Sequence, residues 1–146
     1  MNQLNIQSQD NKTLVLTLLD TAKRLERRLD GNLSNIRGIS FSEYHLLLKL
    51  SEMHERTAMR VDLATAVGLT PSAVTRALKP LEKLGYIATR KNDRDARRSL
   101  AELTPAGLEL LADAEGVVND VIASLPLEST DHKELVRMLQ ALINQR

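Results

Sequence analysis

The 146-residue sequence contains no cysteine and no tryptophan, and it has only one phenylalanine and two tyrosines. Without cysteine, the chain cannot form disulfides, thiolate nucleophiles, cysteine-ligated zinc sites, iron–sulfur clusters or cysteine redox sensors. So few rings predict an aliphatic core and argue against a binding platform of stacked aromatics. No apolar run reaches the roughly 18 residues of a membrane span. The polar start, residues 1–11, lacks a secretory pattern, so we expect a cytoplasmic protein.

Motifs for catalysis and metal binding are also missing. The sequence has no phosphate-binding glycine loop, no dinucleotide fingerprint and no nucleophile elbow. His45 and His54 are nine residues apart, which places them on opposite sides of any shared helix, and His132 stands alone. We therefore expect no metal, no cofactor and no enzymatic activity. The length suits one domain with one sizeable core.

The formal net charge of +1 hides an uneven distribution. Residues 60–98 hold nine basic and four acidic residues, a surplus of five positive charges. Residues 99–146 hold three basic and eight acidic residues, and residues 1–59 are nearly balanced. A basic middle segment predicts a local anion-binding face. The simpler alternative is a solvated charged surface.

Residues 60–84 have the sequence form of a helix-turn-helix. A short helix is predicted over 60–67. Gly68 should end this helix, because glycine adopts the left-handed conformation of a tight turn at no steric cost. A second helix is predicted over 71–84, with Thr70 as its N-cap and a proline in its first position.

The second helix begins with small side chains, which let its end approach base edges closely, and its free N–H groups favour a phosphate. Arg76 suits a guanine edge or a phosphate, and the methyl group of Ala73 or Thr75 can pack on a thymine methyl. Lys79 and Lys83 suit backbone phosphates, which add affinity without sequence information. An ordinary helix pair is the alternative. The candidate DNA contacts on this helix are Thr70, Ser72, Ala73, Thr75, Arg76, Lys79 and Lys83.

Two short strands are predicted next, over 86–90 and 99–103, joined by a polar loop over 91–98. Arginines at a hairpin tip are typical of side chains that enter a narrow minor groove. Asp95 is interpreted as a residue that holds the Arg97 guanidinium in place. A solvated hairpin tip is the alternative. Because the loop lies directly after the helix-turn-helix in the sequence, nucleic-acid binding is favoured over that alternative. The candidate contacts in this loop are Arg94, Asp95, Arg97 and Arg98.

Apolar periodicity and capping signals predict further helices on both sides of this region. The first helix is expected to stop at Gly31, the second follows a Ser40–Glu43 capping box, and Thr104–Pro105 should start the next, which Pro126 breaks. The predicted elements are a helix over 11–30, a connector over 33–37, a helix over 41–53, a polar linker over 54–59, a helix over 105–125 and a last helix from about residue 130 onward.

Several motifs occur in order between residues 38 and 110, and they end with an Asp-x-Arg loop ahead of Leu-Thr-x-x-Gly. With this set the sequence resembles the MarR family of bacterial transcriptional regulators. The outer helices match that family in length and placement only. The motifs are Asp62-Leu63-Ala64, Gly68-Leu69-Thr70, Ser72-Ala73-Val74-Thr75-Arg76, Leu81 to Ile87, Asp95-Ala96-Arg97 and Leu103-Thr104-Pro105-Ala106-Gly107.

The resemblance implies a mainly α fold with a small β-hairpin wing, in which N- and C-terminal helices interlock two protomers. By resemblance, Arg76 and its helix read the major groove of a double-stranded operator, and Arg97 reads the minor groove. We expect one domain over 1–146, with a winged-helix core at 38–104 and dimerisation helices at 11–30 and 105–146. The surplus of apolar helix outside the core agrees with dimerisation, although intrachain packing is the alternative.

The resemblance further implies a ligand-responsive homodimeric repressor on a pseudo-palindromic site. A small-molecule effector would bind between the arms and the core near Phe41 and Tyr44, and Arg27, Arg28 and Arg37 would favour an anion. Two rival functions stay open: a winged helix that binds only protein, and a fragment of an enzyme. A protein-only module predicts binding that ignores salt.

Overall fold

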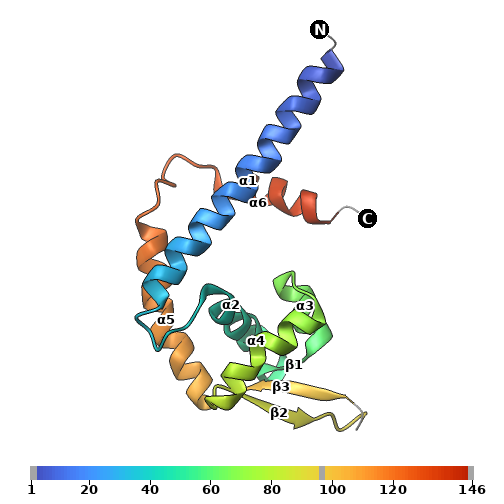
Figure 1. The fold of residues 1–146 in the computed structure, drawn as a ribbon, viewed down its shortest axis with the longest axis vertical. Helices are drawn as coiled ribbons and strands as arrows, with labels where there is room; N and C mark the ends of the chain where they lie inside the picture. Colours follow the sequence, from blue (N-terminus) through green and yellow to red (C-terminus); the bar gives the residue numbers. More distant parts are fainter. Residues whose placement is uncertain (1–2, 96–97, 145–146) are drawn as a thin grey trace.

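The computed structural model describes residues 3–95 and 98–144 (Figure 1). It contains six α-helices, one 3₁₀ turn and three strands within those residues. In chain order they are α1 (Gln3–Leu33), α2 (Phe41–Glu52), η1 (His54–Arg56), β1 (Thr57–Met59), α3 (Arg60–Val67), α4 (Pro71–Lys83), β2 (Ile87–Lys91), β3 (Ser99–Leu103), α5 (Pro105–Ala123) and α6 (His132–Ile143).

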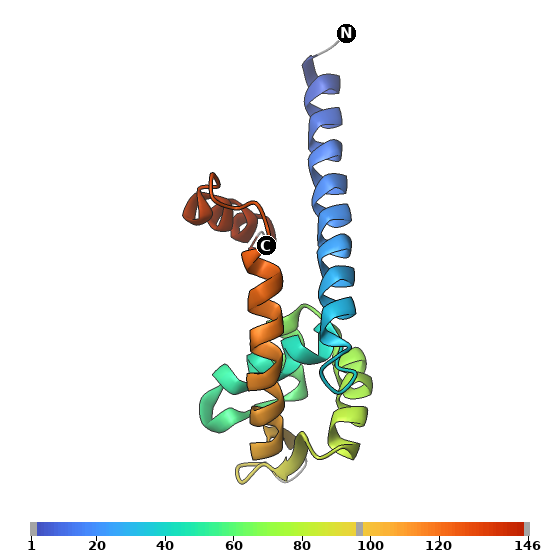
Figure 2. The ribbon, with the colours of Figure 1, turned by 90° about the vertical axis from the view of Figure 1, so that its left-hand side faces the viewer.

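The molecule consists of a winged-helix core and three helical arms, α1, α5 and α6. The core holds α2, α3, α4 and the sheet, and α5 leads away from the wing along the lower part of α1 (Figures 1 and 2). The upper part of α1 projects from the body, and α6 stands apart from it (Figure 2). None of the helices in the described segments has the length and apolar character needed to cross a membrane.

The small sheet is antiparallel, with strand order β1-β3-β2. In the wing hairpin, Ile87 pairs with Leu103 and Lys91 pairs with Ser99. On the other edge of β3, Thr57 of β1 pairs with Glu102. The central strand therefore ties the wing to the segment that immediately precedes α3.

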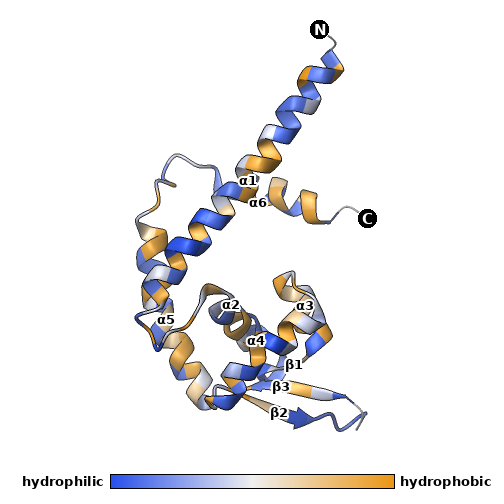
Figure 3. Cartoon of the chain, viewed as in Figure 1, coloured by the Kyte–Doolittle hydropathy of each residue, from blue (hydrophilic) through white to orange (hydrophobic). Residues whose placement is uncertain are grey.

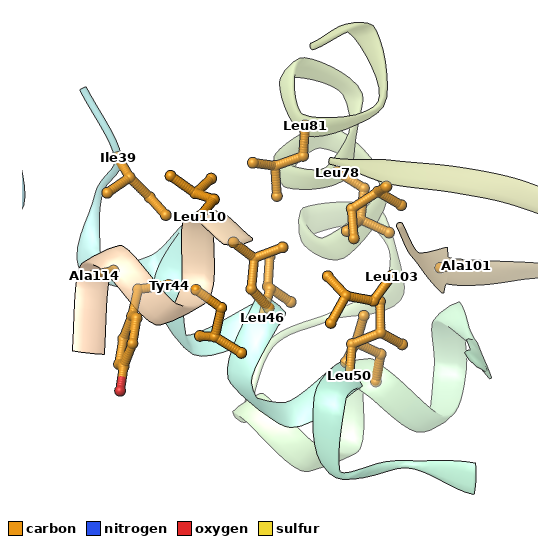
Figure 4. Packing of buried hydrophobic residues seen from close by; sticks show 14 of the residues in the cluster. Ile39, Tyr44, Leu46, Leu50, Leu78, Leu81, Ala101, Leu103, Leu110 and Ala114 are labelled. Carbon is orange, nitrogen blue, oxygen red and sulfur yellow. The ribbon is translucent and has the colours of Figure 1, made fainter. Parts of the chain in front are cut away.

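The hydrophobic core is aliphatic, as the composition predicts, and Tyr44 is its one buried aromatic residue among those described. Leucines from α2, α4, β3 and α5 meet in the middle of the winged helix (Figure 4). Leu46, Leu47 and Leu50 of α2 are completely buried. Truncating such a leucine to alanine typically lowers the stability of a fold by about 2–5 kcal/mol, so these three side chains contribute strongly to the stability of the winged helix.

The three predicted N-caps and the glycine stop at Gly68 are confirmed. Ser40 and Glu43 form the predicted capping box. Thr70 and Thr104 each accept the backbone N–H three residues ahead at 3.1 Å, and each is followed by proline in the first helical turn. Gly68 ends α3 with a φ of 71°, in the left-handed region. These short-range hydrogen bonds depend only on neighbouring residues, which is why the sequence predicts them well.

Four sequence predictions need correction. Helix α1 begins at Gln3 and passes through Gly31 to Leu33, because an exposed glycine only weakens a helix by about 1 kcal/mol. Residues 54–59 are not a plain linker, since they form η1 and β1. The sheet has three strands, and β2 covers 87–91, one residue later than predicted. Helix α5 ends at Ala123, before Leu125, and α6 begins at His132.

Candidate nucleic-acid interface

One face of α4 is exposed, cationic and opposite the core. Ser72, Arg76, Lys79 and Lys83 follow one another at spacings of four, three and four residues, which aligns them along one side of the helix. All four are exposed, whereas Val74, Leu78 and Leu81 on the opposite side are buried. Among the described residues, no carboxylate lies within salt-bridge distance of Arg76, Lys79 or Lys83. We call these four residues the α4 stripe.

The first turn of α4 is less available than the sequence suggests. The Thr70 hydroxyl oxygen accepts the N–H of Ala73 at 3.1 Å, so that donor is used by the cap. The Thr75 hydroxyl donates to the carbonyl of Pro71 at 3.0 Å. Thr75 and Ala73 are also half-buried. These two hydroxyls therefore stabilise the helix start, and Ser72 is the exposed polar side chain of that turn.

The wing presents a second polar surface beyond β2 and β3. Arg94 is exposed, and its backbone N–H donates to Asn92 Oδ1 at 3.0 Å in a tight turn. Asp95 lies 3.5 Å from Arg98 Nε, so within the described part of the loop this carboxylate forms an ion pair with Arg98. Arg97, for which the sequence predicts both a minor-groove contact and pairing with Asp95, lies outside the described residues.

Besides Arg98, two more of the cations counted in the basic segment, Arg60 and Arg90, have carboxylate partners among the described residues. Arg60 Nη2 lies 3.1 Å from Glu82 Oε1, and Arg90 Nη1 lies 3.8 Å from Glu102 Oε2. The Arg60 guanidinium also donates to Ser99 Oγ at 2.9 Å, and the Thr89 hydroxyl donates to Glu82 Oε1 at 2.8 Å. Counting charges along the sequence could not find the cluster around Glu82, because its four members come from four different elements. They are Arg60, Glu82, Thr89 and Ser99.

Phe41 and Tyr44, the predicted effector site, lie on α2, the helix of the core that contacts both α1 and α5. Phe41 stacks on His45 at a ring separation of 5.5 Å and contacts Tyr44 at 6.2 Å. Tyr44 is buried, and its hydroxyl donates to Glu115 of α5 at 3.0 Å. Burial, followed by the hydrogen bond and charge of Glu115, raises the pKa of the Tyr44 hydroxyl above its ordinary value.

Of the three arginines predicted to favour an anionic effector, two have partners in this structure. Arg28 donates to Ser124, the C-cap residue of α5, and Arg37 forms a 3.1 Å ion pair with Asp113. These contacts join α1 and its connector to α5. Arg27 is exposed on α1.

His45 predicts a modest acid sensitivity of the fold. Burial, with a smaller contribution from Lys49, lowers the pKa of His45, whereas Glu26 and Glu52 act in the opposite direction. Because the pKa of His45 is lower in the folded protein, the unfolded chain binds a proton at this side chain more tightly. The free energy of unfolding is therefore greatest above the ordinary histidine pKa and decreases as acid protonates the side chain. We expect the urea midpoint to drop between about pH 7 and pH 5.5. In His45→Gln the decrease of the urea midpoint should be smaller than in the wild type. An equal decrease would show that other titrating groups cause the acid sensitivity.

The family model that matches this chain is that of the MarR family, over residues 39–99. That span runs from the residue before the α2 cap to the first residue of β3. The winged-helix core belongs to the MarR family. In this MarR-family core, the α4 stripe and the wing are both exposed and basic. The predicted mainly α fold with a β-hairpin wing is confirmed.

Known MarR-type proteins resemble the chain beyond its core. The HTH-type transcriptional regulator YdgJ of Bacillus subtilis is 31% identical over 111 residues, covering 73% of this chain and 65% of YdgJ, just under two thirds. The transcriptional repressor YetL of Bacillus subtilis is 25% identical over 134 residues, covering 90% of this chain and 80% of YetL. Sco3205, a MarR family regulator from Streptomyces coelicolor crystallised with DNA, aligns with a TM-score of 0.79 at 24% identity, covering 91% of this chain and 84% of Sco3205.

Proposed function

We propose that this protein is a sequence-specific, double-stranded DNA-binding transcriptional regulator. The observation that carries the proposal is the α4 stripe, whose three cations have no carboxylate partner in the described part of the chain and face away from the core of a helix-turn-helix. An α-helix fits the major groove, where Arg76 has the geometry to bind guanine and Lys79 and Lys83 can reach phosphates. The wing, with Arg94 and Arg98, would lie over the adjacent minor groove.

We also propose that the regulator is a homodimer. The chain exposes 10795 Å² of surface, whereas a compact monomer of 16.3 kDa exposes about 7,500 Å². The difference is well above the roughly 800 Å² that each partner contributes to a standard interface. A second copy that covers the arms would account for it. Two-fold symmetry would then set two α4 helices about 34–36 Å apart and demand a pseudo-palindromic site.

The apolar side chains that need a partner lie on the arms. In α1, every residue from Gln3 to Arg24 is exposed, including several leucines. In α6, no residue is buried, although one side of the helix is apolar (Figure 3). We therefore assign residues 1–146 to one dimerising unit, with a DNA-binding core at 38–104 and arms on either side. The exposed apolar residues of these two helices are Leu4, Ile6, Leu14, Val15, Leu16, Leu18, Leu19, Leu135, Val136, Met138, Leu142 and Ile143.

The regulatory role that we propose is repression, in which the bound dimer occludes a promoter. The name of YetL, a transcriptional repressor, supports this choice. A small-molecule effector would act near Phe41 and Tyr44, at the junction of α2 with the arms, by favouring a dimer with wrongly spaced reading helices. A thermal-shift titration with aromatic carboxylates tests the effector: no shift with any of them would count against it.

Replacing Arg76 by alanine should weaken and broaden DNA recognition. A duplex enriched from a random-sequence library by the wild-type protein serves as the specific probe, and a shuffled duplex of equal composition serves as the reference. Loss of a bidentate base contact should cost about 1–3 kcal/mol on the enriched duplex. The shuffled duplex should lose much less. Fluorescence anisotropy titrations measure both affinities.

Two other variants separate base reading from charge. Lys83→Ala should weaken both duplexes alike and lower the slope of log K against log salt by about 0.9. Arg24→Ala removes the same charge from an exposed site on α1 and should leave both affinities near wild type. If Arg76→Ala binds both duplexes like wild type, α4 is not the reading helix. Binding that ignores salt would instead favour the protein-interaction alternative.

A further inference from the structure

Four side chains from four elements meet beside the hairpin of the wing. Arg60 starts α3, Glu82 lies in the last turn of α4, Thr89 lies in β2 and Ser99 starts β3. The Arg60 guanidinium donates to Glu82 at 3.1 Å and to Ser99 at 2.9 Å, and Thr89 donates to the same Glu82 oxygen at 2.8 Å. We call this set the helix–wing cluster.

The helix–wing cluster is set apart from the surface proposed to meet DNA. The side chains of Arg60 and Glu82 are only 23% and 29% exposed, and their charges cancel. Glu82 also lies off the α4 stripe, one position before Lys83 and therefore about 100° around the helix. The cluster thus adds no net charge to the basic face. Its geometric effect is to tie the end of the reading helix to both strands of the wing.

We infer that the helix–wing cluster sets the spacing between the α4 stripe and the wing, so Arg60 and Glu82 are positioning residues for DNA recognition. This inference rests on the proposed function. A protein that contacts two grooves at once gains affinity only if both surfaces are held at the right separation. The guanidinium fork suits this task because its fixed geometry holds two partners together, whereas a lysine ammonium has no such fork.

The test compares Glu82→Gln and Arg60→Lys with wild type on the enriched and shuffled duplexes. Glu82→Gln keeps the size of the side chain and removes the charge that holds Arg60. We expect a roughly tenfold loss on the enriched duplex, comparable to one mismatched base pair, and little loss on the shuffled one. Arg60→Lys keeps the charge but not the fork, so its loss should be smaller. Hydroxyl-radical cleavage should show weaker protection in the minor groove under the wing, while dimethyl sulfate still reports protected guanines in the major groove.

Glu102→Gln is the matched control, because it makes the same charge change within the wing and, among the side chains that the structure describes, breaks only the 3.8 Å contact with Arg90. It should leave both footprints intact. Wild-type behaviour of Glu82→Gln would overturn the inference. So would an equal loss in both grooves and on both duplexes together with a lower melting temperature, which would show a general folding role. If the wild-type protein enriches no duplex at all, the DNA-binding proposal fails, and this inference fails with it.

Discussion

Replacing Gly107 by alanine should destabilise the fold by about 3 kcal/mol, at the upper end of the range for overpacking. Gly107 is buried in the first turns of α5, directly against the segment that links α4 to β2. A Cβ atom there would stand 2.2 Å from the carbonyl oxygen of Tyr86 and 2.6 Å from a methyl group of Leu103. A backbone oxygen cannot move aside as the end of a flexible side chain can.

The same junction holds hydrogen bonds that the clash would disturb. Thr104 donates its N–H to the Tyr86 carbonyl at 3.2 Å, and its hydroxyl lies 2.6 Å from the carbonyl of Gly85. Gly107 in turn donates its N–H to the Thr104 hydroxyl at 3.1 Å. Pushing α5 away from Tyr86 would therefore weaken the cap of α5 as well as its packing.

Urea unfolding of Gly107→Ala and Gly116→Ala measures the effect against a matched control. Gly116 lies on the same helix, but its added Cβ would meet nothing within 4 Å. Because alanine is the better helix former, Gly116→Ala should stabilise the protein by about 0.5–1 kcal/mol. An unchanged midpoint for Gly107→Ala would show that α5 does not pack on Tyr86 as described.

Charging the apolar side of α6 should convert the proposed dimer to monomers and abolish tight operator binding. Leu135 and Leu142 lie seven residues apart on one side of α6 and are 40% and 54% exposed. In the double variant Leu135→Glu/Leu142→Glu, a dimer interface would have to bury two unpaired carboxylates, which is strongly unfavourable. A monomer engages one half-site at a time and loses the avidity of a linked pair, a factor of about 100 or more.

Light scattering on a sizing column measures the mass, and anisotropy measures affinity for the enriched duplex. The control, Lys133→Glu/Gln140→Glu, places two carboxylates on the opposite, polar side of α6 and should remain dimeric. A wild-type protein that is monomeric at micromolar concentration would refute the dimer. A charged variant that still dimerises would show that the interface lies elsewhere, on α1.

Local sequence signals account for the helix-turn-helix and for much of the candidate site. Ser40, Thr70 and Thr104 cap helices through hydrogen bonds that span three residues, so a short window of sequence contains all the participants. The α4 stripe follows in the same way from residue spacing, once the helix is known. Strand β1 escaped prediction because Thr57 pairs with Glu102, far along the chain. Three residues without alternating hydrophobicity give no local sign of a strand.

The sequence by itself therefore determined the order of the helices and of the wing hairpin, the capped helix starts and the basic character of the segment that contains the helix-turn-helix, because capping, turn formation and helical periodicity act between near neighbours. Only the tertiary structure decided which of those charges face solvent. It withdrew Arg60 into contact with Glu82, left Arg76 and Lys83 uncovered, and brought Gly107 against Tyr86. Such choices depend on which side of each element the core buries, and that is settled when distant segments pack together.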